Sequence, residues 1–133
     1  MIVHILRFAF KDGVRDEDKA AGLEAISGTA ALDSVSFSSI GQNLGGSVDG
    51  YSHAYCVGIA DLVSLDRYMN DPIHRAGDFV FAPLVARIAI FDMSDDLDPE
   101  LGSKIMAMHE RRSTSDPEWG RLFGTIPEVR IYA

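Results

Sequence analysis

The segment from Ile2 to Phe10 is apolar on both of its alternating faces, and this limits the folds open to the chain. It is short, and the turn Lys11-Asp12-Gly13 ends it, which favours a β-strand over a helix. Side chains along a strand alternate between the two sides of a sheet. Because both sides of this strand are largely apolar, we expect a sheet that is covered on both faces.

The segments that follow alternate between helix and strand patterns in a recognisable order. An acidic run followed by apolar residues at helical spacing predicts a helix over residues 16–31. A second helical region starts at Asp61, restarts at Asp71-Pro72 and is interrupted at Pro83. Further strands are predicted over residues 34–40, 53–60 and 87–93. The order strand, helix, strand, strand, helix, strand predicts an α+β fold, a ferredoxin-like split βαβ with an antiparallel sheet.

A ferredoxin-like domain places its helices on one face of the sheet only. The opposite face of these strands is also apolar, so it needs another partner. A second copy of the chain provides that cover most simply, and we expect a homodimer.

Residues 94–133 differ in character from residues 1–93. An acidic linker is followed by apolar residues at helical spacing, by the helix-start signature Asp116-Pro117, and by a possible last strand at 129–132. This stretch is too apolar for solvated disorder. We therefore divide the chain into a ferredoxin-like A/B barrel domain, 1–93, and a C-terminal extension, 94–133. We expect the extension to dock on the body or the partner subunit, over a cavity mouth or the dimer seam.

Composition and charge exclude several classes of function. The 133 residues have a net charge of −8 and no basic stripe, which argues against nucleic-acid binding. No apolar run reaches the roughly 20 residues that a membrane-spanning helix needs, and no export signal is recognised at the start. The one cysteine, Cys56, cannot form an internal disulfide, so we expect a reducing, cytoplasmic location.

Tyr68 and His74 lie on either side of the helix start Asp71-Pro72. His74 falls in the first turn of that helix, where the partial positive charge of the N-terminus disfavours imidazolium. The ring is then neutral and can accept a proton. From these residues alone, a core tyrosine and a surface histidine are the favoured interpretation.

Four short motifs resemble the stress-responsive A/B barrel (Dabb) family of dimeric α/β-barrel proteins, over about residues 2–93. The motifs are Ile2-Val3-His4-Ile5, Gly50-Tyr51-Ser52-His53, Tyr68 with Asp71-Pro72-Ile73-His74, and Ile90-Phe91-Asp92. One characterised member of the family is a plant polyketide cyclase that closes a linear thioester by an aldol reaction without metal or cofactor.

The resemblance implies a role for five residues. His74 corresponds to the general acid/base, Asp92 to the carboxylate that orients it, and Tyr68 to a hydrogen-bond donor for the substrate oxygen. His4 and His53 correspond to histidines that line or adjoin the substrate cavity. No cofactor and no metal are implied, and the histidine spacing does not suggest a zinc site.

Two hypotheses follow. In the first, the protein is a cofactor-independent acid/base enzyme, such as a cyclase, lyase or isomerase, that acts on a small apolar carbonyl compound. In the second, it is a non-catalytic dimeric stress protein or small-ligand-binding protein, in which the same residues form a structural network. We expect His109, in the extension, to lie at the surface and Cys56 to lie away from the histidine face.

Overall fold

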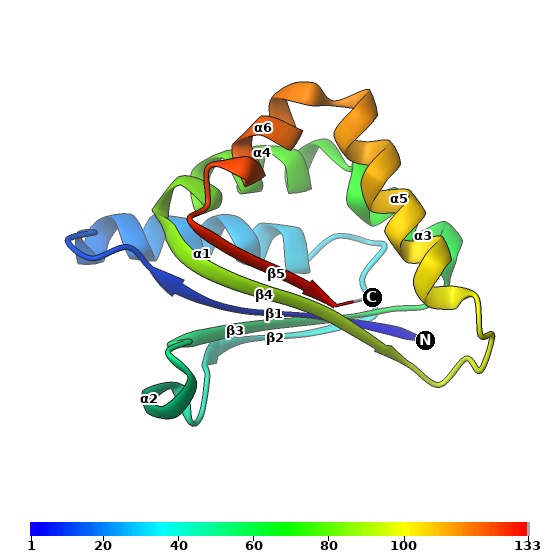
Figure 1. Ribbon diagram of the computed structural model, residues 1–133, viewed down its shortest axis with the longest axis horizontal. Coiled ribbons are helices and arrows are strands. Elements are labelled where there is room, and N and C mark those ends of the chain that lie inside the picture. The colour runs from blue at the N-terminus through cyan, green and yellow to red at the C-terminus, as the bar shows by residue number, and fades with distance from the viewer. Residues whose placement is uncertain (133) are drawn as a thin grey trace.

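The computed structural model describes residues 1–132 and places them in a five-stranded sheet with helices packed over one face (Figure 1). The strand order is β2-β3-β1-β4-β5. The first four strands pair antiparallel, and β5 runs parallel to β4 at the edge. The strands are β1 (Ile2–Phe10), β2 (Phe37–Gln42), β3 (His53–Ile59), β4 (Val85–Ser94) and β5 (Glu128–Tyr132).

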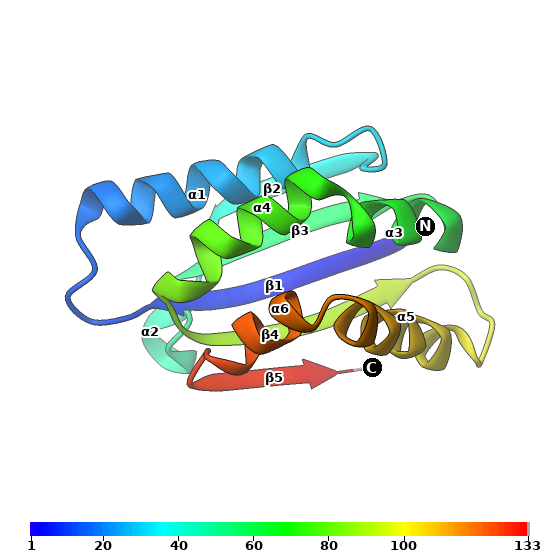
Figure 2. The same ribbon diagram turned by 90° about the horizontal axis from the view of Figure 1, so that it is seen from above.

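The main helices form a second layer on the same side of the sheet. Figure 2 shows α1 and α4 side by side over the β2 half of the sheet and α5 and α6 towards the β5 half. The ferredoxin-like α+β prediction is therefore confirmed. The helices are α1 (Asp16–Ala30), α2 (Gly46–Asp49), α3 (Leu62–Asn70), α4 (Pro72–Phe81), α5 (Leu101–Ser115) and α6 (Pro117–Gly124), with a 3-10 turn, η1, at Ala82–Leu84. No helix within residues 1–132 is both long and apolar enough to span a bilayer.

Aspartate caps define where three of the helices begin. The side chain of Asp61 accepts a hydrogen bond from the amide of Ser64 at 2.8 Å, and that of Asp71 accepts one from Ile73 at 2.8 Å. Asp116 likewise accepts from the amide of Trp119 at 3.2 Å. Each cap satisfies an amide that has no partner within the helix. The starts of α3, α4 and α6 thus follow from local sequence.

Two predicted boundaries differ from the structure. The strand expected from residue 34 begins at Phe37, because the amide of Val35 instead bonds to the carbonyl of Leu32 in the turn that leaves α1. The loop after β2 contains the short helix α2, with Gly45 and Gly50 in the left-handed region on either side of it. This segment lies below the sheet, away from the other helices (Figure 1).

The core fills the space between the sheet and the helices. Phe8, Tyr55 and Ile88 point into it from three neighbouring strands, and Phe81 meets them from α4. The register places His4 opposite Asp92 on β4 and opposite Val57 on β3, so all three lie on the helix-covered face.

The opposite face of the sheet carries the alternate residues. Val3 lies opposite Met93, and Ile5 lies opposite Phe91. Met93 is 61% exposed, and Phe37 on β2, which shares this face, is 48% exposed. Within the described chain, an apolar sheet surface is therefore left open to solvent.

The C-terminal extension packs on the body of the same chain. α5 contacts α3, α6 contacts α4, and β5 extends the sheet beside β4. Arg75 on α4 holds the extension through its Nε atom, which donates to Asp116 Oδ2 at 2.6 Å. The extension therefore lies over the same side of the sheet as the histidines of β1 and α4.

Candidate active site

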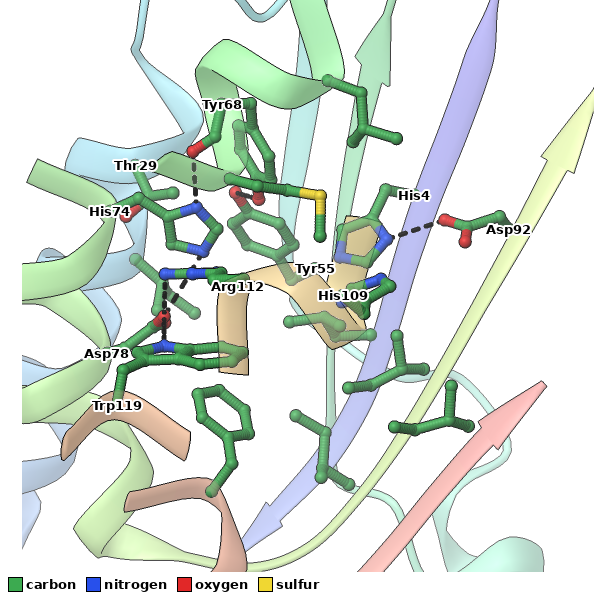
Figure 3. A pocket seen from close by; sticks show the side chains of 18 of the residues that line it. His4, Thr29, Tyr55, Tyr68, His74, Asp78, Asp92, His109, Arg112 and Trp119 are labelled. Atoms are coloured by element: carbon green, nitrogen blue, oxygen red, sulfur yellow. Dashed lines mark hydrogen bonds and ion pairs between the residues drawn. The ribbon is translucent and has the colours of Figure 1, made fainter. Parts of the chain in front are cut away.

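A cavity of about 150 Å³ lies between the sheet, α4 and the C-terminal extension (Figure 3). Most of its lining is apolar and includes Leu6, Ile90 and Ile105. The polar and titratable side chains of the lining come from both parts of the chain. They include His4, Tyr55, Tyr68, His74, Asp78, Asp92, His109, Arg112 and Trp119.

His74 has a fixed tautomer. It is the third residue of α4, and its Nδ1 lies 2.8 Å from the main-chain oxygen of Tyr68. Because a carbonyl oxygen only accepts hydrogen bonds, Nδ1 carries the hydrogen and the neutral ring keeps its lone pair on Nε2. Burial lowers the pKa of His74, the carboxylate of Asp78 raises it, and Arg112 lowers it. His74 is therefore a neutral base near pH 7.

Asp78 lies one helical turn after His74, on the same side of α4. Its Oδ2 atom is 3.5 Å from Nε2 of His74. The same oxygen accepts hydrogen bonds from Nε1 of Trp119 at 2.8 Å and from Nη2 of Arg112 at 3.1 Å. Asp78 is only 5% exposed, so these two donors stabilise a buried carboxylate.

Arg112 and Trp119 come from α5 and α6 of the extension. The guanidinium carbon of Arg112 lies 3.8 Å from the centre of the Trp119 ring, and Arg112 is 6% exposed. Burial lowers the pKa of Arg112, whereas the Asp78 carboxylate raises it. Figure 3 shows the guanidinium beside the His74–Asp78 pair and next to the indole of Trp119.

A second histidine–carboxylate pair lies on the sheet. His4 Nδ1 is 2.7 Å from Oδ1 of Asp92, its cross-strand neighbour. An ionised carboxylate can only accept, so Nδ1 donates and Nε2 is the free nitrogen of the neutral ring. The ring of His109 lies 6.4 Å from that of His4. Burial, followed by the nearby His4, lowers the pKa of His109 to about 4.

Tyr55 and Tyr68 form a buried phenol pair between the two histidine pairs. Their hydroxyl oxygens are 2.8 Å apart. The Tyr68 ring centre lies 4.4 Å from that of His74 and 6.1 Å from that of His4. Burial raises the pKa of both phenols, so both hydroxyls stay protonated at neutral pH and can donate.

Comparison with known proteins identifies the fold that carries this site. Residues 2–95 match the Stress responsive A/B Barrel Domain, Dabb. The chain belongs to the Dabb family. No match is found among curated proteins.

Three solved structures with this fold illustrate the similarity. A dimeric ferredoxin-like protein of unknown function from Thermobifida fusca is 24% identical, with a TM-score of 0.62, over 70% of this chain and 89% of that one. A Dabb family protein with a ferredoxin-like fold from Mesorhizobium loti is 22% identical, with a TM-score of 0.61, over 71% and 96%. Hydroxynitrile lyase from Passiflora edulis is 14% identical, with a TM-score of 0.62, over 73% and 96%.

The Dabb domain brings together four of the five residues singled out in the sequence. His4, Tyr68, His74 and Asp92 all line the cavity. The expected contact of Asp92 with His74 is wrong, because Asp92 faces His4 across the β1–β4 ladder and bonds to it. The carboxylate beside His74 is Asp78.

His53 lies apart from these four. It is on the same face of β3 as Tyr55 and Val57, but it pairs with Phe8, whereas Val57 pairs with His4. Phe8 follows His4 by four residues along β1, so His53 lies roughly 13 Å along the strand direction from the position of His4. The His53 ring stacks on Phe8, with centroids 5.5 Å apart, and is not among the described residues that line the cavity.

Besides Tyr55, four residues of the site were not predicted from the sequence. Asp78 follows His74 by four residues in a helix, and this spacing was a usable signal because it places both side chains on one face. His109, which was expected at the surface, is half-buried and lines the cavity. Neither His109 nor the remaining two, Arg112 and Trp119, had a local signal, because only the docking of the extension brings them to the site.

Proposed function

We propose that this Dabb protein is a cofactor-independent acid/base enzyme, a cyclase, lyase or isomerase, acting on a small, largely apolar carbonyl compound. The observation that carries the proposal is the tautomer of His74. Its Nδ1–H is held by the main-chain oxygen of Tyr68, and this leaves Nε2 as the basic atom in a mostly apolar cavity.

The first step is removal of a proton from the carbon next to the substrate carbonyl. The C–H bond breaks, the proton binds Nε2 of His74, and the electron pair moves onto the carbonyl oxygen to form an enolate. The imidazolium is stabilised by the Asp78 carboxylate at 3.5 Å. When the enolate is conjugated to a C=C bond, return of the proton from His74 to the far carbon gives an isomer. Attack of the enolate carbon on a second carbonyl of the same molecule forms a C–C bond and an alkoxide, which takes the proton from His74 to give a cyclic alcohol.

The phenol pair stabilises the enolate oxygen in this proposal. When Tyr55 donates its hydroxyl hydrogen to Tyr68, the hydroxyl of Tyr68 is free to donate to the substrate. His4, held by Asp92, accepts a hydrogen bond through Nε2 from a hydroxyl group of the substrate. Asp92 is thus a positioning residue for His4, and His53 has no part in the site.

The test uses hydrogen exchange at the carbon next to a carbonyl, since the proposed first step removes a proton there. Cyclohexanone and acetophenone in D2O are followed by NMR with and without protein. We expect the protein to accelerate exchange, and His74→Gln to reduce the acceleration by about 10²-fold or more. Tyr68→Phe should reduce it as well.

His53→Gln is the matched control, because it changes a histidine of β3 that lies outside the cavity. Its exchange rate should equal that of the wild type. An acceleration that His74→Gln and Tyr68→Phe leave unchanged would show that the assignment is wrong, as would the absence of acceleration for both ketones.

A non-catalytic ligand-binding role is the second candidate. It is favoured by the way in which the polar groups of the site bond to one another, as in the pairs His4–Asp92 and Tyr55–Tyr68. The same assay separates the two roles. A ketone that binds, as seen by its NMR line broadening, without faster exchange would identify a binding protein.

We also propose that the protein is a homodimer that buries the open face of the sheet. Val3, Ile5 and Phe91 make this face apolar near its centre, and Met93 extends it. Apolar sheet faces of this kind are normally covered. The similar protein from Thermobifida fusca is described as dimeric, which supports the same assembly here.

Within each subunit, we propose that residues 1–93 form the barrel domain and residues 94–133 form a cover for its site. The cover supplies His109, Arg112 and Trp119 to the cavity lining. It is also held to α4 by the Arg75–Asp116 ion pair.

A further inference from the structure

We propose that Arg112 is an anion-binding residue of the cavity, and that the ligand is a small monocarboxylate whose apolar body is the size of a single ring. The inference deepens the proposed function, because it names the substrate class of the same site. Because its test measures binding alone, the result for this inference does not depend on whether the protein is an enzyme.

Arg112 leaves most of its hydrogen-bond donors unused. A guanidinium has five N–H groups in a planar fork. Among residues 1–132, the side chain of Arg112 donates one hydrogen bond, from Nη2 to Oδ2 of Asp78. Its Nε and Nη1 atoms are not sealed inside protein, and Arg112 lines the cavity. Four N–H groups therefore remain for a ligand.

The contact of Arg112 with Asp78 uses only part of the guanidinium. Arg112 binds Asp78 through one nitrogen and one oxygen, although a guanidinium matches a carboxylate best through two parallel hydrogen bonds. Asp78 Oδ2 also takes a hydrogen bond from the indole of Trp119 at 2.8 Å. Because Trp119 shares the stabilisation of Asp78, the fork of Arg112 is left open for a second carboxylate.

The guanidinium of Arg112 is held in place by its neighbours. Its plane is supported by the Trp119 ring at 3.8 Å, and the side chain is only 6% exposed. A buried cation that is held in place loses little side-chain entropy and little hydration when it binds an anion. Its hydrogen bonds to a carboxylate are therefore strong. An exposed arginine would bind the same group weakly.

The size of the cavity limits the rest of the ligand. A volume of about 150 Å³, lined by side chains such as Leu6, Ile90 and Ile105, matches one six-membered ring. With the carboxylate on Arg112, the body of the ligand lies beside Tyr68 and His74, which line the same cavity. A keto acid of this size would present its carbonyl to both.

Arg112 also belongs to the part of the chain that extends beyond the family domain. The Dabb match ends at residue 95. The structure from Mesorhizobium loti is covered over 96% of its own length, yet the match spans only 71% of this chain. The anion site is thus a specificity that the extension adds to the barrel.

The experiment compares benzoate with benzamide, a neutral compound of nearly the same shape, by calorimetry and by NMR titration of the full-length protein. We expect wild-type protein to bind benzoate about tenfold more tightly than benzamide, or better, as befits charge-assisted hydrogen bonds in a buried site. Arg112→Lys keeps the charge but loses the fork, so the preference should fall.

Removing Arg112 alone leaves Asp78 buried without its cation, which can unfold the protein. The double variant Asp78→Asn/Arg112→Gln removes both charges together and should bind the two compounds equally. Arg111→Gln is the matched control, since Arg111 is the exposed neighbour on α5, and its preference should equal that of the wild type.

Equal binding of benzoate and benzamide by the wild type, or a benzoate preference that survives in the double variant, would overturn the inference. No binding of benzoate at millimolar concentration would overturn it too. A benzoate preference that depends on Arg112, found in a protein without ketone exchange activity, would support the anion site and reject the enzyme proposal. Ketone exchange without a benzoate preference would support the enzyme proposal and reject the anion site.

Discussion

Nδ1 of His4 lies 2.7 Å from Oδ1 of Asp92, and this bond joins two residues that face each other across the β1–β4 ladder. His74 has its own carboxylate neighbour, Asp78, one helical turn away. The cavity therefore contains two independent histidine–carboxylate pairs, one on the sheet and one on α4. The phenols of Tyr55 and Tyr68 lie between them.

Substitutions at Asp78 and Arg112 should move the pKa of His74 in opposite directions. The Asp78 carboxylate raises this pKa and the Arg112 guanidinium lowers it. We expect Asp78→Asn to lower the pKa of His74 further below its ordinary value, and the double variant Asp78→Asn/Arg112→Gln to raise it again relative to Asp78→Asn. The Cε1–H resonance of His74, followed by NMR against pH, measures both shifts. Arg111→Gln should leave the resonance unchanged, and a pKa that is lower still in the double variant than in Asp78→Asn would contradict the described geometry.

The stability of the protein should fall with acid partly because of His109. Burial holds the pKa of His109 at about 4 in the folded state, against 6.5 for an unperturbed histidine. The unfolded chain therefore binds more protons below pH 6.5, and the stability present above that pH is lost as the pH falls towards 4. We expect a loss of about 2 kcal/mol between pH 7.5 and pH 5 from this residue.

Urea unfolding of the wild type and His109→Gln at both pH values checks this expectation. The variant should lose about 2 kcal/mol less than the wild type over the same interval. Other groups, including His74, whose pKa burial also lowers, contribute equally to both proteins. Identical losses in the two proteins would show that His109 is not buried as described.

Sequence patterns predicted the local features of the fold because local interactions determine them. Asp61, Asp71 and Asp116 mark helix starts through hydrogen bonds that span two or three residues. Strand alternation likewise assigned His4 and His53 to faces of their strands. Alternation gives the face but not the position along the strand, and for this reason it could not separate His53 from the cavity.

Contacts that arise from tertiary packing could not be predicted from such patterns. The partner of Asp92 depends on the register of β1 against β4, which places His4 opposite it. Arg112 and Trp119 reach Asp78 from 34 and 41 residues away, through the docking of α5 and α6. The spacing of four residues between His74 and Asp78 is the exception, because a helix fixes that contact by itself.

The Tyr55–Tyr68 pair should show strong coupling in stability. Each phenol is buried, and its hydroxyl bonds to the other at 2.8 Å. Tyr55→Phe leaves the hydroxyl of Tyr68 without its partner, at a cost of about 1–3 kcal/mol, and Tyr68→Phe has the corresponding effect. The double variant removes both hydroxyls and should be little worse than either single variant.

A double-mutant cycle from thermal or urea unfolding measures this coupling, which we expect to be about 1 kcal/mol or more. Costs that simply add would show that each hydroxyl has another partner. The cycle bears on function as well, since Tyr68→Phe should also slow ketone exchange. The hydroxyl of Tyr55 acts through Tyr68, so Tyr55→Phe should slow exchange less.

Dimerisation should depend on the open face of the sheet. Ile5 lies on the central strand β1, opposite Phe91, and points away from the helices. Ile5→Glu places a carboxylate in the middle of the proposed interface, where burial without a partner costs several kcal/mol. We expect the wild type to have twice the molar mass of the chain in light scattering after gel filtration, and Ile5→Glu to have the mass of one chain.

Val63→Glu is the control for this experiment, because Val63 is 72% exposed on α3, in the helix layer. It adds the same charge to an apolar site away from the open face and should leave the dimer intact. A monomeric wild type, or an Ile5→Glu variant that stays dimeric, would exclude the sheet face as the interface. Because the cavity lies on the opposite side of the sheet, the Ile5→Glu monomer should still bind benzoate, which separates assembly from the site.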